Sequence, residues 1–72
     1  MANTTEIYRR DSEQVTIMAY LGRGSGDLDE IRRIVVRDGD IVEDGIAYHG
    51  DRGWQWLTDQ RAAYTADGFE HA

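Results

Sequence analysis

The sequence has no cysteine, no lysine and no proline among its 72 residues, and only two histidines. Without cysteine the chain has neither a disulfide nor a cysteine-based zinc site, and His49 and His71 alone cannot build a metal cage. No apolar run approaches the roughly 18 residues of a membrane-spanning helix, and residues 1–10 lack the apolar centre of a signal peptide. We therefore expect a cytoplasmic protein without a metal or an organic cofactor.

A chain of 72 residues forms one domain at most. A domain of this size buries only about 60% of the surface of its unfolded chain, so its stability is marginal. Self-association or binding to a partner is the remaining way to bury more surface. The sequence therefore predicts a single domain over residues 1–72 with flexible ends at 1–4 and 66–72, present as a homodimer or in an obligate complex.

Acidic residues outnumber basic ones by fourteen to eight, which gives a net charge of −6, and every base is arginine. Residues 27–51 hold eight of the acids and three of the arginines, so this segment carries nearly all of the net charge. An acidic field repels nucleic acid and anionic membranes and attracts basic partners. A GC-rich genome or adaptation to high salt would also explain the charge, without any functional meaning.

Two segments near the N-terminus have the pattern of paired strands. Residues 5–10 contain β-branched and aromatic side chains, and Asp11-Ser12-Glu13 is a turn signal. Residues 14–21 alternate strictly, and both of their faces are largely apolar. Such a strand is either covered on both faces or presents a hydrophobic surface to a partner.

Residues 27–36 have the pattern of a helix, because apolar side chains recur at helical spacing. Asp27 can cap its N-terminus and Gly39 can end it. The alternative is a strand, since Ile34-Val35-Val36 are all β-branched. Asp38-Gly39 would then be the turn of a hairpin that joins 32–37 to 40–43.

Residues 45–57 have the pattern of a β-hairpin. Ile46 and Tyr48 alternate before the polar turn Gly50–Gly53, and Trp54 and Trp56 alternate after it. Large aromatic side chains bury roughly 150–250 Å² each, so these rings are expected to form much of the core. The alternative is an exposed aromatic binding face.

The fold class that these patterns predict is α+β. Two β-hairpins would form one small antiparallel sheet with the helix packed on it, and residues 58–64 would add a short C-terminal helix. The alternative is an all-β small barrel of the SH3-like kind, in which residues 29–37 form a strand.

Residues 39–57 carry a partial motif. Gly39-Asp40-Ile41-Val42 followed by Gly50-Asp51-Arg52-Gly53 resembles the KOW-type motif of small SH3-like barrels. The resemblance implies a curved β-sheet and, in that family, RNA binding. His49 stands where the family has a basic residue, the spacing between Gly45 and Gly50 is off by one, and the basic RNA-binding surface is missing.

Several chemistries can be excluded from spacing. The glycine-rich residues 22–26 lack the lysine of a phosphate loop and lead into acids that oppose a phosphate. The acidic residues 38–45 lack two ligands of a calcium loop, because Val42 and His49 stand at ligand positions. No nucleophile lies near these acids or near His49. We therefore expect a protein that is not an enzyme.

The interpretation that the sequence favours is a small acidic inhibitor or adaptor that docks on a basic, nucleic-acid-binding surface of a larger protein. Its acids would imitate a phosphate backbone, and phage-encoded inhibitors such as anti-CRISPR proteins are similar in size and acidity. The alternatives are a self-associating module with an aromatic interface that includes Tyr20, and a degenerate KOW-like nucleic-acid binder. The favoured interpretation selects as partner-binding residues Asp27, Asp29, Glu30, Asp38, Asp40, Glu43, Asp44, Tyr48, Trp54 and Trp56.

Overall fold

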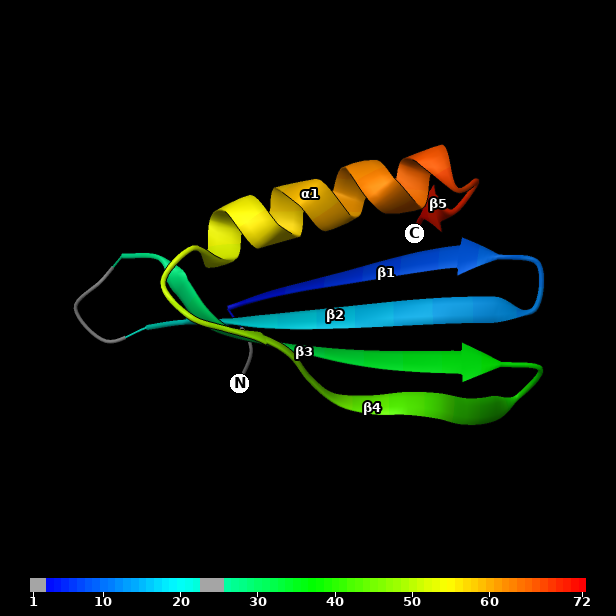
Figure 1. Cartoon of the computed structure of the whole chain (residues 1–72). Helices are drawn as coiled ribbons and strands as arrows, with labels where there is room; N and C mark the ends of the chain where they lie inside the picture. The colour runs from blue at the N-terminus through cyan, green and yellow to red at the C-terminus, as the bar shows by residue number, and fades with distance from the viewer. Residues whose placement is uncertain (1–2, 23–25) are drawn as a thin grey trace.

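The protein folds into one antiparallel sheet with a single helix, within the residues 3–22 and 26–72 that the computed structural model describes. The strands follow the order β4-β3-β2-β1-β5 across the sheet, and the α+β class is confirmed. Figure 1 shows helix α1 on one side of the strands with its C-terminal end near β5. The elements are β1 Thr4–Arg10, β2 Glu13–Leu21, β3 Leu28–Arg37, β4 Asp40–His49, α1 Gly53–Ala66 and β5 Glu70–His71.

Strands β1 and β2 pair across a tight turn. Their register runs from Thr4 opposite Ala19 to Arg10 opposite Glu13. Asp11 in the turn has a φ of 53°, in the left-handed region that aspartate adopts more readily than most residues. Both strands therefore lie where the alternation of the sequence predicts them, to within one residue.

The predicted helix over residues 27–36 is wrong, because Leu28–Arg37 is strand β3. Asp38 and Gly39 have φ values of 52° and 83°, and they form the turn that joins β3 to β4. Two successive residues with positive φ match the twist of a hairpin. The β-branched residues and the turn signal therefore outweigh the helical spacing. Residues 23–25 of the glycine-rich segment 22–26 lie outside the described residues.

The predicted hairpin over residues 45–57 is also wrong. Residues 45–49 end strand β4, and Trp54 and Trp56 belong to helix α1, which also takes in the predicted short helix over 58–64. Arg52 precedes the helix without capping it by its side chain. Instead Asp27 Oδ1 accepts a hydrogen bond of 2.9 Å from the backbone N–H of Trp54. The cap comes from the residue before β3, far away in sequence, so no local pattern marks this helix N-terminus.

The core lies between the helix and one face of the sheet. Gly53 packs on the backbone of Leu28 at one end of the helix, and Tyr64 stacks on Tyr8 of β1 towards the other end. The helix thus crosses the sheet from β3 towards β1. The buried apolar side chains are Tyr8, Val15, Ile17, Ala19, Leu28, Ile31, Val35, Leu57 and Phe69.

The sheet is open, with β4 and the short β5 as its edges. The alternative of a closed SH3-like barrel is therefore wrong, and Gly53 of the KOW-like motif begins a helix. β5 pairs with β1 at Tyr8 and Arg9, while Phe69 packs into the core. None of the helices in the described part of the chain has the length and apolar character that a membrane crossing requires.

Candidate binding surface

Strand β4 is an exposed edge of the sheet. Among the described residues no strand pairs with its outer side, and residues 40–44 are all exposed. Ile41, Val42 and Ile46 are exposed to 65%, 52% and 59%, which is high for large apolar side chains. Exposed apolar side chains on a sheet edge are typical of a surface that meets another molecule.

The net charge of the chain is concentrated on this strand and its flanking turns. Residues 38–51 contain five acids and no arginine, whereas the rest of the chain contains nine acids and eight arginines. Five of the six net negative charges therefore belong to this strand and its flanking turns. We call this segment, residues 38–51, the acidic edge.

The acids of β4 differ in their surroundings. No hydrogen bond or ion pair within the described ranges holds the carboxylates of Asp40 and Asp44. Glu43 accepts a 2.5 Å hydrogen bond from Arg33 Nε, and this bond raises the pKa of Arg33. Asp38 accepts a 2.6 Å hydrogen bond from Ser12 Oγ. Asp40 and Asp44 are thus the charges most available to a partner.

The other three predicted acids lie at the opposite end of β3 from Asp38. Asp27 is half-buried and caps the helix, so its role is structural. The backbone carbonyl of Asp29 accepts a 3.0 Å hydrogen bond from Gly50 N–H, and Glu30 lies opposite His49 in the ladder. The structure thus brings the predicted acids of residues 38–44 together and separates Asp27, Asp29 and Glu30 from them.

Two β-bulges interrupt β4. Val42 and Ala47 have no partner in β3, because the register shifts at both positions. Bulges bend an edge strand and hinder regular pairing with an additional strand. The acidic edge therefore presents charged and apolar side chains better than it presents a continuous row of backbone hydrogen-bonding groups.

The aromatic residues do not share a face. The rings of Tyr48 and Trp56 pack against each other at 5.8 Å on the side that α1 covers, and both are half-buried. Trp54 is 44% exposed on the helix. Tyr20 lies in β2 between residues that alternate with the buried row, so it faces the other side of the sheet. The aromatic interface over Tyr20, Tyr48, Trp54 and Trp56 is therefore wrong as one surface.

This arrangement predicts different effects for the two tryptophans. Trp56→Ala should lower the free energy of unfolding by about 2 kcal/mol, because a half-buried ring loses its contacts with Tyr48. Trp54→Ala should change it by less than about 1 kcal/mol. Urea unfolding followed by far-ultraviolet circular dichroism measures both, and a larger loss for Trp54 than for Trp56 would contradict the packing described here.

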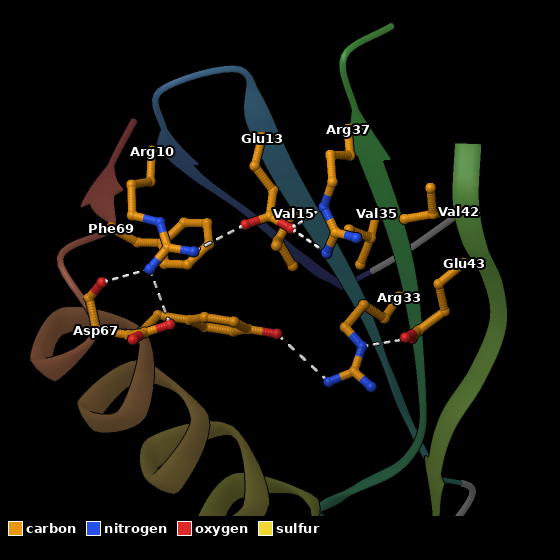
Figure 2. Close-up of a pocket in the computed structure, with 11 residues that line it drawn as sticks. Arg10, Glu13, Val15, Arg33, Val35, Arg37, Val42, Glu43, Asp67 and Phe69 are labelled. Carbon is orange, nitrogen blue, oxygen red and sulfur yellow. Dashed lines mark hydrogen bonds and ion pairs between the residues drawn. The ribbon is translucent and has the colours of Figure 1, made fainter. Parts of the chain in front are cut away.

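A cleft of about 450 Å³ opens between the C-terminal end of the helix and the β3–β4 hairpin. Figure 2 shows three arginines and three carboxylates around an apolar floor that includes Val15, Val35 and Phe69. The cleft is balanced in charge, and its lining contains no histidine, cysteine, serine or lysine. The lining residues are Arg10, Glu13, Val15, Arg33, Val35, Arg37, Val42, Glu43, Tyr64, Asp67 and Phe69.

The charged groups of the cleft neutralise one another. Glu13 accepts a 2.6 Å hydrogen bond from Arg37 Nη2 and a 3.1 Å hydrogen bond from Arg10 Nη2. The bond from Arg37 is the main cause that lowers the pKa of Glu13. Arg10 also pairs with Asp67 at 3.0 Å and lies over the ring of Phe69. The cleft thus ties the hairpins to the end of the helix, and it offers ion pairs rather than an activated nucleophile.

A second polar cluster fastens the helix to β1. Glu6 is only 5% exposed, and its two carboxylate oxygens accept hydrogen bonds of 2.9 and 3.0 Å from Arg61 Nε. Tyr8 donates a 2.5 Å hydrogen bond to the same carboxylate. The bond from Arg61 lowers the pKa of Glu6, while burial and the bond to Glu6 raise the pKa of Tyr8 to about 12.

This cluster and the cleft were not predicted from the sequence. Glu6 and Tyr8 are two residues apart, which places both side chains on one face of a strand, and this spacing was the available signal. Arg61 lies 55 residues further along the chain from Glu6. Nothing in the sequence indicates that pairing.

Comparison with known proteins gives no match. No protein-family model matches the chain. Neither a characterised protein nor a solved structure is significantly similar to it.

Proposed function

We propose that the protein is a non-catalytic acidic binding module, an inhibitor or adaptor that docks its acidic edge on a basic surface of a larger protein. The observation that carries this proposal is the location of the charge. Residues 38–51 hold five acids and no arginine, on the exposed edge strand and its flanking turns. Charge of one sign on one edge steers a partner of opposite charge and orients it.

The composition of the rest of the chain supports this proposal over a general adaptation. A GC-rich genome or a high-salt environment would select acids on every exposed surface. Outside the acidic edge, however, the chain contains nine acids and eight arginines. Several of these side chains form ion pairs, such as Arg61 with Glu6. The acidic edge is therefore the exception on a nearly neutral chain.

The partner surface that fits best is one that binds nucleic acid, because such surfaces are strongly basic. The apolar side chains of Ile41, Val42 and Ile46 lie among the acids and would add contact area beyond the charge. We also propose that Asp40, Asp44 and their neighbours imitate a phosphate backbone. A cytoplasmic location is part of the same proposal.

Capture from a lysate of the source organism at two salt concentrations tests the proposal. The immobilised protein should retain a stoichiometric nucleic-acid-binding protein at low salt and release it at high salt, because screening weakens charge-dominated association. Retention of the immobilised protein alone, or of partners that high salt does not release, would count against the proposal.

A further inference from the structure

The face of the sheet opposite the helix is uncovered. In β2 the residues that alternate with the buried row Val15, Ile17 and Ala19 are only half-buried, and no described segment packs on them. The ladder places equivalent residues of the neighbouring strands beside them. Apolar side chains on this open face are Ile7, Met18, Ile34, Val36, Ile41 and Ile46.

These side chains form one patch. Thr16 of β2 lies between Ile7 of β1 and Ile34 of β3, at the centre of the face. Val36 lies opposite Ile41, and it continues the patch onto the edge strand. The patch therefore spans four adjacent strands, whereas isolated apolar side chains on a surface need no explanation.

The open face is close to neutral. Its ionised side chains are Arg9 and Arg32, which are basic, and Glu30, Asp44 and Glu70, which are acidic. Two copies of the protein can therefore approach through this face with little net repulsion. Contact through the acidic edge would instead bring five negative charges of each copy together.

The size of the face matches the lower range of stable dimers. Four strands spaced about 4.8 Å apart, with seven to ten residues each at about 3.4 Å per residue, give a flat area of roughly 450–650 Å². Two copies would bury about twice that area before the relief of the side chains is counted. Stable interfaces begin at roughly 1,200 Å² of total buried area, so the dimer would lie at the small end of this range.

We propose that the occupant of the open face is a second copy of the chain, packed sheet to sheet as in a β-sandwich. This inference does not rest on the charge of the acidic edge, although the open face shares Ile41, Asp44 and Ile46 with it. The dimer would cover Ile41, Asp44 and Ile46 and leave Asp38, Asp40 and Glu43 of each acidic edge exposed. It would therefore present two equivalent docking edges to a partner.

Sedimentation velocity over a dilution series tests the dimer. The native protein should have twice the 8.2 kDa mass of the chain at high micromolar concentration, and Ile34→Glu should weaken the dimer by at least about 100-fold. Ala62→Glu adds the same charge at an exposed helix position and should leave the dimer unchanged. Circular dichroism checks the fold of each variant.

Thr16→Arg is the second variant, because it removes no apolar contact from the monomer. It tests whether the open face forms the dimer if Ile34→Glu fails to fold. It should also dissociate the dimer, whereas Ala62→Arg should not. A native protein that stays at the mass of one chain at every concentration would overturn the inference. So would a folded Thr16→Arg variant that remains dimeric, since the two copies would then meet elsewhere.

Discussion

Replacing Gly53 by alanine is expected to lower the free energy of unfolding by about 3 kcal/mol or more. A Cβ atom at Gly53 would lie 2.1 Å from the carbonyl oxygen of Leu28 and 2.3 Å from its Cβ. These are atoms of a buried strand residue, so the helix would have to move off the sheet. Helix propensity alone predicts a gain of about 1 kcal/mol, the opposite sign. Urea unfolding measures the change.

Gly45→Ala is the matched control. A Cβ atom there meets nothing within 4 Å, so the substitution should change the free energy of unfolding by less than about 0.5 kcal/mol. A Gly53→Ala variant as stable as Gly45→Ala would show that the helix does not begin against the backbone of Leu28.

Arg61→Met is expected to lower the free energy of unfolding at neutral pH by about 2 kcal/mol. The change leaves the carboxylate of Glu6 buried without its main partner, a loss that costs about 3–5 kcal/mol in fully buried pairs. The expected loss of stability is smaller here because the side chain of Arg61 is 44% exposed and water screens the pair. Adding Glu6→Gln to Arg61→Met removes the uncompensated charge and keeps an acceptor for Tyr8. The double variant should be more stable than Arg61→Met alone.

The pH dependence of stability follows from the same cluster. Because the pKa of Glu6 is held below its ordinary 4.5 in the folded state, the contribution of the ionised pair is fully present above about 4.5. It is lost as the pH falls from there through the folded-state pKa. Glu6→Gln should reduce this acid loss without abolishing it, because the pKa of Glu13 is lowered as well.

At alkaline pH the change of stability with pH has the opposite sign. The pKa of Tyr8 is raised from 10.0 to about 12, so its contribution is present below pH 10 and is lost between 10 and about 12. Tyr8→Phe should remove that loss. Free energies of unfolding measured at a series of pH values test both sides, and acid and alkaline profiles that neither Glu6→Gln nor Tyr8→Phe changes would contradict the described hydrogen bonds.

Local sequence patterns correctly predicted β1 and β2. They failed where contacts between residues far apart in sequence determine the secondary structure. Strict alternation over residues 14–21 and a turn signal located β1 and β2, because the relevant contacts are between neighbours in sequence. Over residues 28–37 helical spacing and β-branched composition disagreed, and pairing with β2 and β4 decided for the strand. At Trp54 and Trp56 the alternation suggested a strand, whereas the cap from Asp27 and the close contact of Gly53 with Leu28 begin a helix.

The candidate surface was predicted in part. Only the second half of the acid-rich middle of the sequence, residues 38–51, forms the acidic edge. Asp27, in the first half, caps the helix instead. The exposed apolar side chains of β4 were not predicted, because which strand lies at an edge depends on the whole topology. The tryptophans were selected for their size, and only the structure separates the packed Trp56 from the exposed Trp54.

The acidic edge is tested most directly by comparing two variants that lose the same charge. Asp40→Asn with Asp44→Asn neutralises two exposed acids of β4, while Asp11→Asn with Asp59→Asn neutralises two exposed acids elsewhere. Both variants and the native protein are used to capture partners from the same lysate at low salt, and mass spectrometry quantifies what each retains. We expect the first variant to retain at least about tenfold less partner than the native protein, and the second to retain nearly the native amount. Equal retention by the two variants would contradict a docking surface on β4.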